Sequence, residues 1–268
     1  VAADWNTVIA ESREDAPAIV FLVENVDGTI IDQVVAPATA GFNRVAWDLR
    51  YPSVEPWEPV PEGEEAHEGA GILVIPGSYA VSMYKRVNGE MIDLGQKQTF
   101  NVVSIRPDPA IEGSSQQQRV IFEAQVDELL RAAAGSSEAV DAVIGELDAV
   151  KATLHRSMTD GSLYELAHSI QQSLKASNEK LTDNELRDAY NDLAIMSVQA
   201  RLWHARFDPS SSAHGPTAAQ KESLRIARKL YDETVAELTQ LVDGDYAALK
   251  EAMDIAKVPW TPGRGIQE

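Results

Sequence analysis

The sequence predicts an α+β protein in two parts, an antiparallel Ig-like β-sandwich over residues 1–110 and an up-and-down α-helical bundle over residues 111–268. In the first part, short runs rich in β-branched residues are separated by turn dipeptides, which is typical of a sandwich. After the segment RPDPAIEGSS the apolar spacing changes from every second residue to a helical period of about 3.6. The length of 268 residues, 44% of them hydrophobic, is sufficient for two ordinary cores.

The clearest strand signals lie on either side of glycine turns. The runs Ala18–Asn25 and Thr29–Ala36 flank an Asp-Gly dipeptide, so they are predicted to form a β-hairpin. A further strand is predicted over Ser78–Val87, and the Asn-Gly dipeptide that follows predicts a second hairpin, whose return strand or strands end at Ile105.

The stretch NRVAWDLR, Asn43–Arg50, alternates between apolar and polar residues and is predicted as another strand. Val45, Trp47 and Leu49 are expected to point inward, which leaves Arg44, Asp48 and Arg50 outward. Trp47 and Tyr79 are interpreted as core aromatics of the sandwich, with sugar stacking as the alternative.

Apolar stripes predict the helices of the second part. One stripe begins at Phe122, a second runs over Val140–Met158, and a shorter one covers Leu163–Leu174. Thr182 is predicted to be the N-cap of a helix over Asp183–Phe207, with Glu185 three residues further on completing a capping box. Because this helix carries apolar residues on two opposite sides, we expect it at the centre of the bundle.

The end of the chain follows a similar pattern. Thr217 is predicted to begin another helix, and Gly244 interrupts the apolar stripe of that helix. A last short helix is predicted before Pro259. The closing residues, TPGRGIQE, are predicted to be a tail.

Charge and composition exclude several classes of protein. With a net charge of −19 and a pI of about 4.6, the surface repels phosphate backbones and anionic lipid headgroups, so no nucleic-acid partner is expected. The absence of cysteine excludes disulfides, thiolate metal sites and cysteine nucleophiles. Because no run approaches the roughly 18 apolar residues of a membrane span, no membrane insertion is expected.

Three stretches in order, GFNRVAWDLRYP, IPGSYAVSM and FNVVSIRPDP, resemble the module that follows the β-propeller in bacterial sortilin-like BNR (Asp-box) repeat proteins. Those proteins are often labelled glycosyl hydrolases. Their pattern ends in Asp-Pro-Arg, whereas here Asp108 and Pro109 are followed by Ala110. The Trp-Asp and Gly-x-Tyr elements are also similar to the Ig-like module of flagellar-hook capping proteins.

The resemblance implies an Ig- or fibronectin-like sandwich with a helical bundle, and a propeller as a missing partner N-terminal to Val1. The first residues, VAADWNTVIA, lack the features of a signal peptide and lack an initiator methionine. We therefore expect a mature or excised portion of a longer product. The resemblance implies that this product is exported, to the periplasm or outside the cell. No Asp-box of the form Ser-x-Asp-x-Gly-x-x-Trp occurs in this sequence.

The segment PSVEPWEPVPEGEEAHEGA, residues 52–70, is predicted as an acidic insertion loop. Long loops within compact domains are often functional or disordered. In one interpretation Trp57 anchors a docking loop against a propeller or another subunit. In a second interpretation the glutamates bind a cation weakly, although they lack the alternating spacing of a calcium loop. In a third interpretation the segment is a solvated acidic insertion. The candidate binding residues are Trp57, Glu62, Glu64, Glu65 and His67.

Motifs for catalysis are missing from the sequence. It has no His-x-x-x-His or His-Glu-x-x-His pair and no Gly-x-Ser-x-Gly elbow, and TPGRG lacks the strand-to-helix context of a phosphate-binding loop. We therefore predict no catalytic residue, no metal site and no cofactor for this chain.

These observations favour a non-catalytic accessory module of a larger exported propeller protein, making protein–protein contacts. One alternative is a carbohydrate-binding or hydrolase-associated protein, with a site at the sandwich–bundle junction built from Trp57, His204 and the acidic loop. Another alternative is an oligomerisation module that associates through its helices.

Overall fold

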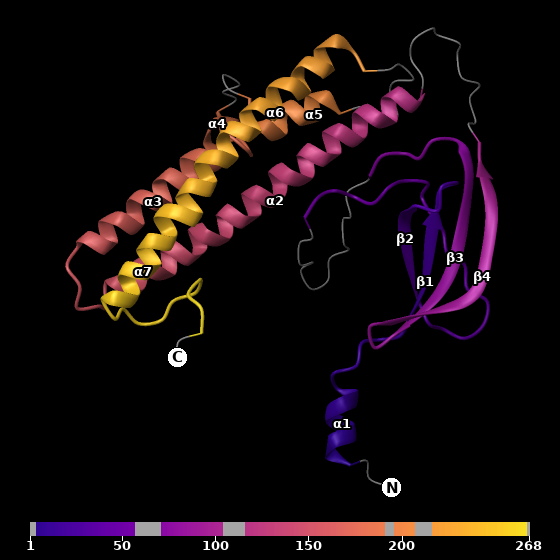
Figure 1. Cartoon of the computed structure of the whole chain (residues 1–268), viewed down its shortest axis with the longest axis horizontal. Helices are drawn as coiled ribbons and strands as arrows, with labels where there is room; N and C mark the ends of the chain where they lie inside the picture. Colours follow the sequence, from indigo (N-terminus) through magenta and orange to yellow (C-terminus); the bar gives the residue numbers. More distant parts are fainter. Residues whose placement is uncertain (1–3, 57–70, 104–115, 191–195, 207–215, 267–268) are drawn as a thin grey trace. The chain divides into compact units, whose positions relative to one another are not determined.

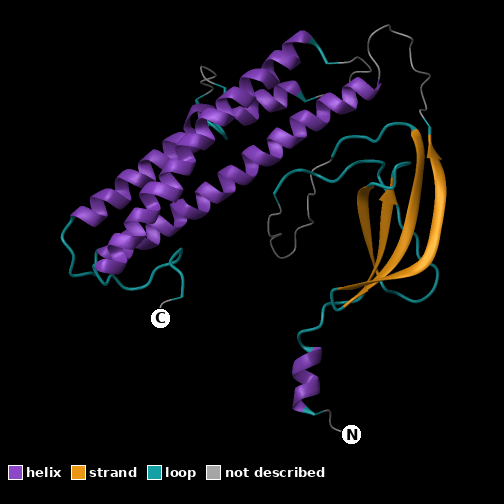
Figure 2. Ribbon diagram, in the orientation of Figure 1, coloured by secondary structure: helices purple, strands orange, loops and turns teal. Residues whose placement is uncertain are grey.

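The computed structural model describes residues 4–56, 71–103, 116–190, 196–206 and 216–266. The protein is α+β, with a four-stranded antiparallel sheet and a set of helices (Figures 1 and 2). The chain divides into two compact units, which are Val1–Ser53 with His67–Val120 and Val54–Ala66 with Ile121–Glu268. Among the described residues, no helix combines the length and the apolar composition needed to cross a membrane.

The sheet is built from two hairpins, as the glycine turns predict. Strand β1 (Ala18–Glu24) pairs with β2 (Ile30–Pro37), and β3 (Gly77–Val87) pairs with β4 (Glu90–Val102). Because β1 also pairs with β3, the strand order is β2-β1-β3-β4. At the tight turn of the second hairpin, Gly89 has a φ of 78°, a conformation that glycine adopts without a steric penalty.

The strand predicted over Asn43–Arg50 is wrong. The whole segment lies in the described part of the chain, and it contributes an isolated bridge from Arg50 to Leu73 rather than a strand. Leu49 has a φ of 66°, and the Asp48 side chain accepts a hydrogen bond from the backbone N–H of Arg50 at 2.9 Å. Such local side-chain bonds compete with an extended ladder. Consequently Leu49 is exposed and does not point inward, and neither does Val45.

Trp47 nevertheless reaches the core of the sheet, so its predicted role as a core aromatic is confirmed. Its ring centroid lies 5.8 Å from that of Tyr79 and 6.0 Å from that of Phe100, both in edge-to-face geometry. The Tyr79 hydroxyl donates to the carbonyl of Ile75 at 2.5 Å, and the indole N–H of Trp47 donates to the carbonyl of Arg50 at 3.1 Å. The aromatic cluster thereby fastens the irregular segment to one face of the sheet.

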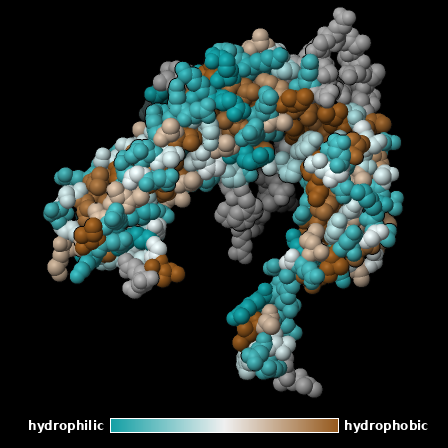
Figure 3. Space-filling model, in the orientation of Figure 1, coloured by the Kyte–Doolittle hydropathy of each residue, from teal (hydrophilic) through white to brown (hydrophobic). Residues whose placement is uncertain are grey.

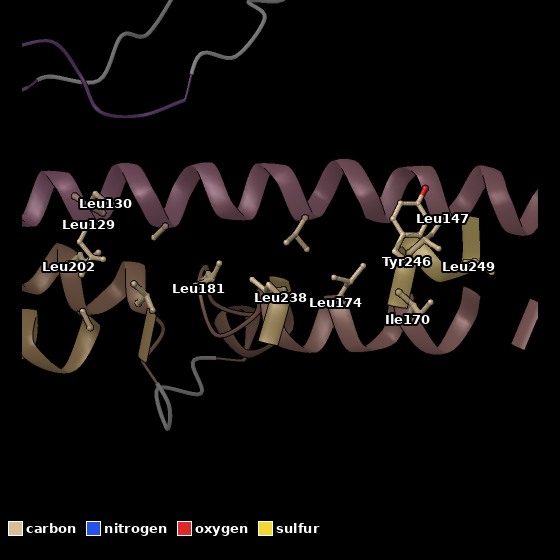
Figure 4. Packing of buried hydrophobic residues seen from close by; sticks show 14 of the residues in the cluster. Leu129, Leu130, Leu147, Ile170, Leu174, Leu181, Leu202, Leu238, Tyr246 and Leu249 are labelled. Atoms are coloured by element: carbon tan, nitrogen blue, oxygen red, sulfur yellow. The ribbon is translucent and has the colours of Figure 1, made fainter. Parts of the chain in front are cut away.

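A single apolar core runs through the helical unit (Figure 4). Helix α2 (Gln116–Leu154) is one continuous helix of 39 residues, although its stripes were predicted separately. Helix α3 (Ser162–Asn178) follows, and α6 (Ala218–Thr239) begins at the predicted N-cap, Thr217, which forms a capping box with Gln220. Buried positions recur along the whole of α2, at Phe122, Val126, Leu129, Ala133, Val140, Leu147, Val150 and Leu154.

A π-helical turn replaces the predicted interruption at Gly244. Helix α6 continues without a break through η1 (Gln240–Tyr246) into α7 (Ala247–Ile255). A π-turn accommodates one extra residue within a helix. From Leu238, the last buried residue of α6, helical spacing passes the partly buried Leu241 and Val242 and then reaches Asp245, but Tyr246 is the buried residue and Asp245 is exposed. The turn therefore moves the apolar stripe by one position.

The single central helix predicted over Asp183–Phe207 is also wrong. The structure has two short helices, α4 (Glu185–Ala189) and α5 (Val198–Ala205), and Ser197 begins α5 by accepting the backbone N–H of Ala200 at 3.1 Å. An N-cap serine at this point marks a new helix start. Of the predicted apolar residues, Val198 and Leu202 of α5 are buried, whereas Leu186, Tyr190 and Trp203 are exposed.

Thr182 does not cap a helix, which corrects the predicted capping box. Its hydroxyl donates to the carbonyl of Asn178, one turn back. Asn184 takes the capping place instead, and its side-chain oxygen accepts the backbone N–H groups of Leu186 and Arg187 at 3.0 and 3.3 Å.

We expect Trp47→Ala to lower the local stability of β3 and β4 by about 2–4 kcal/mol, because it removes the edge-to-face contacts with Tyr79 and Phe100 and leaves a cavity. Amide hydrogen exchange of these two strands measures this loss. Phe42→Ala is the matched control, since Phe42 is 91% exposed, and it should change protection by less than about 0.5 kcal/mol. Equal losses in the two variants would contradict the assigned role of Trp47.

Candidate functional site

The five residues predicted to bind a partner, Trp57, Glu62, Glu64, Glu65 and His67, lie outside the described residues. The docking loop therefore stays a prediction. His204, which the carbohydrate-binding alternative uses, is exposed on α5. Among the described residues, no three His, Asp or Glu side chains converge in a way that could hold a metal ion.

Helices α2 and α3 are joined by a regular series of side-chain contacts. The Asn178 amide donates to Asp141 at 3.1 Å, and the Gln171 amide donates to Asp148 at 2.8 Å. The third contact pairs the rings of His155 and Tyr164, whose centroids are 4.8 Å apart.

Successive contacts are seven residues apart on both helices, and the α3 numbers fall as the α2 numbers rise. This spacing is that of an antiparallel heptad pairing. Gln171, 1% exposed, also donates to the carbonyl of Ile144 at 3.0 Å and accepts from Lys151 at 2.5 Å. These groups are occupied with each other, so the series aligns the two helices rather than presenting free polar groups to a substrate.

A buried carboxylate lies near the start of α2. Asp127 is 6% exposed, and its carboxylate lies 3.9 Å from Nε of Arg206, at the end of α5. The guanidinium of Arg206 also lies 5.2 Å from the ring centre of Trp203, a cation–π contact. Burial raises the pKa of Asp127, while the charges of Arg206 and Arg131 act to lower it. The two side chains lie between two helices, and because burial outweighs the attraction of the arginines, ionisation of Asp127 lowers the stability of the fold.

Sequence reasoning missed this pair because Glu123 and Asp127, four residues apart, resemble the solvated face of an amphipathic helix. Both are buried. The sequence nevertheless held a signal in Leu130, which lies three residues beyond Asp127 and so shares a helix face with both carboxylates. An apolar residue on that face indicates that the face is packed, and Leu130 is indeed buried.

A second buried polar cluster lies near the other end of α2. The hydroxyl of Tyr246, in η1, donates to Oε2 of Glu146 at 2.8 Å, and Figure 4 shows this ring directed toward α2. Burial and the bond to Glu146 raise the pKa of Tyr246 far above its usual range, so the phenol stays protonated and acts as a donor. Nζ of Lys250 lies 4.5 Å from the centre of the same ring. The cluster provides no free base or nucleophile.

The short helix α1 (Trp5–Glu11) presents an apolar stripe at the surface. Trp5, Val8 and Ile9 have the spacing of one helix face, and Trp5 is 77% exposed. None of the seven residues of α1 is buried, and apolar atoms are visible on its surface in Figure 3. Exposed apolar residues gathered on one helix face are typical of contact surfaces.

Comparison of the chain with known family models, with curated proteins and with solved structures found no match. The resemblance to the propeller-associated module therefore stays a prediction.

We expect Asp127→Asn to gain stability relative to the natural chain as the pH rises from about 4 to 7. The pKa of Asp127 is raised from its ordinary value of 3.8 in the folded state. The stability that protonated Asp127 gives is therefore complete below the unfolded pKa and is lost as the pH rises through the folded pKa. Urea unfolding followed by helical circular dichroism at several pH values measures the difference.

Asp148→Asn is the matched control on the same helix. Bonds to Gln171 and Lys151 lower the pKa of Asp148, so the natural chain should gain stability relative to this variant as the pH rises. If both variants followed the pH in the same direction, the role given to the burial of Asp127 would be wrong.

Proposed function

We propose that this chain is a non-catalytic accessory module that contacts a protein partner through α1. The observation that supports this proposal is the exposed stripe of Trp5, Val8 and Ile9. Helix-in-groove recognition uses apolar residues at this spacing, and large aromatic side chains are frequent anchors of interfaces.

The charge around α1 indicates the chemistry of its partner. Asp4, Glu11, Glu14 and Asp15 surround the stripe, with Arg13 as the single cation in this segment. Charged rims select partners of the opposite sign. The partner that we propose is therefore a protein groove with an apolar floor and lysine or arginine at its edge.

The resemblance suggests a β-propeller of the same product as that partner, and another subunit is the alternative.

The finer fold is part of the proposal. We assign the sheet to one layer of an Ig-like sandwich, supported by the segment around Trp47 that covers one face. We assign the helices to an up-and-down bundle, supported by the antiparallel contacts between α2 and α3. Domains over residues 1–110 and 111–268 and an exported location belong to the same proposal.

Two other functions would produce different observations. A carbohydrate-binding or hydrolase-associated protein would turn over or retain defined sugars. An oligomerisation module would form contacts between copies, and the exposed Leu186 and Tyr190 of the α4 region would suit this role.

A photo-cross-linking phenylalanine analogue placed at position 5 or at position 7 of the full chain tests the proposal in the native host. Thr7 lies on the opposite side of α1 from Trp5, by helical geometry. We expect position 5 to give a cross-link that maps to an apolar segment of a partner protein bordered by Lys or Arg. This cross-link should be lost in Val8→Asp, and position 7 should give none.

Equal cross-linking from both positions would contradict the docking role of the stripe. Cross-links confined to a second copy of the chain would favour oligomerisation instead. Hydrolysis of glycosides by the purified chain with defined kinetics would overturn the non-catalytic assignment.

A further inference from the structure

The residues after α7 are bound to the helices, which corrects the predicted tail. We call Val258–Gly265 the C-terminal strap. The backbone N–H of Val258 donates to the carbonyl of Met253 at 3.0 Å, and Lys257 has a φ of 56°, which turns the chain back at the helix end. Within the strap, Thr261 is 1% exposed and Arg264 is 7% exposed.

The Arg264 guanidinium organises the strap. Its Nη1 donates to the carbonyls of Val258 and Pro259 at 3.0 and 2.8 Å, and its Nη2 forms an ion pair with Asp254 of α7. The indole N–H of Trp260 donates to the carbonyl of Arg264 at 2.9 Å. The planar fork of arginine suits such several-fold contacts, whereas an ammonium group does not reproduce them.

Gly263 lies directly against the Tyr246–Glu146 pair. It has a φ of 79°, and a Cβ atom added there would lie 2.0 Å from Oε2 of Glu146 and 2.8 Å from the Tyr246 hydroxyl. Only glycine permits this approach together with this backbone conformation. Gly265 differs, because a Cβ added there would have no atom within 4 Å.

We propose that Glu146, Tyr246 and Asp254 form a recognition site for a Gly-Arg peptide segment, and that the chain's own C-terminal strap occupies this site. The site requires glycine for close approach to the Glu146–Tyr246 pair and arginine for the ion pair with Asp254. The strap is joined to the helices covalently at one end, so its effective concentration keeps competing peptides out. This inference goes beyond the proposed function and is independent of the α1 stripe.

Trypsin cleavage of full-length variants tests whether the strap is held in this way. Gly263→Val should release the strap, because the new side chain meets Glu146 and Tyr246. Cleavage after Arg264, followed by mass spectrometry, should then be at least about tenfold faster than in the natural chain, since proteolysis follows the population of the open form. Gly265→Val is the matched control and should cleave at the natural rate.

Peptide binding tests the recognition site itself. A labelled peptide with the sequence of Lys257–Ile266 is added to each full-length protein, and fluorescence anisotropy is measured. We expect binding to the Gly263→Val chain and none to the natural or Gly265→Val chains, whose own straps fill the site. A peptide that carries valine in place of Gly263 should not bind to any of them.

Three results would overturn the proposal. The first is that trypsin cleaves the Gly263→Val chain at the rate of the natural chain. The second is that the strap is released but the natural peptide does not bind to the variant. The third is that the natural peptide and the valine peptide bind equally well. If circular dichroism shows loss of helix in Gly263→Val, Arg264→Ala serves as the second releasing variant. It too must bind the natural peptide, and failure to do so overturns the proposal.

Discussion

The apolar face of α2 is the constraint on which the rest of the helical unit depends. This face extends over a helix of 39 residues and includes Val126, Leu147 and Val150, none of them measurably exposed. Removing one such side chain from water contributes about 1.5–3 kcal/mol, whereas a glycine inside a helix costs about 1 kcal/mol. The helix therefore continues through Gly135 and Gly145, and the segments that follow must cover it from end to end. Helix α3 does so in antiparallel heptad register, and α6 with α7 does so alongside.

That requirement also accounts for the π-helical turn. Without the extra residue of η1, the core position two turns beyond Leu238 would fall on Asp245, which would bury a carboxylate. The turn instead places Tyr246 there, with its hydroxyl bonded to Glu146. Tyr246 and Glu146 then form the surface against which Gly263 lies. A one-residue irregularity in α6 thus determines where the end of the chain is bound.

The sequence predicted those elements whose signals are local. The two hairpins follow from β-branched runs joined by glycine turns, and α6 follows from Thr217 with Gln220 three residues on. The strand predicted over Asn43–Arg50 is wrong although apolar and polar residues do alternate there. The Asp48 side chain accepts a hydrogen bond from the backbone N–H of Arg50, and this local bond replaces the pairing of a strand. The core role of Trp47 was predicted correctly, because burial of a large aromatic side chain is favourable whether its segment is a strand or irregular.

The helix predicted over Asp183–Phe207 failed for a related reason, because apolar residues on two sides of a helical pattern do not show that both sides are buried. In the structure Val198 and Leu202 are buried, whereas Leu186 and Trp203 are exposed. Ser197 carried the deciding signal, as an N-cap residue in the middle of the pattern. The strap and the pairing of Asp127 with Arg206 were beyond prediction, because both depend on contacts between residues far apart in the sequence, although the burial of Asp127 had a signal in Leu130. For the candidate binding residues of the acidic loop, which lie outside the described part of the chain, the sequence prediction stands as made.

Arg206 and Arg264 share a physical role in this acidic chain, which has 23 Lys and Arg against 42 Asp and Glu. Arg206 immediately follows α5, and Arg264 bonds the carbonyls that follow α7. Helix C-termini favour cations because unpaired carbonyls and the helix dipole point there. Each guanidinium also pairs with an aspartate, Asp127 or Asp254, so each connects a helix end to another segment. Most carboxylates in the described part of the chain are exposed and repel one another, and these two cations provide attraction where the chain must change direction. At Arg264, lysine would supply the charge but not the simultaneous contacts to carbonyl and carboxylate groups. This connection therefore depends on the shape of the arginine side chain as much as on its charge.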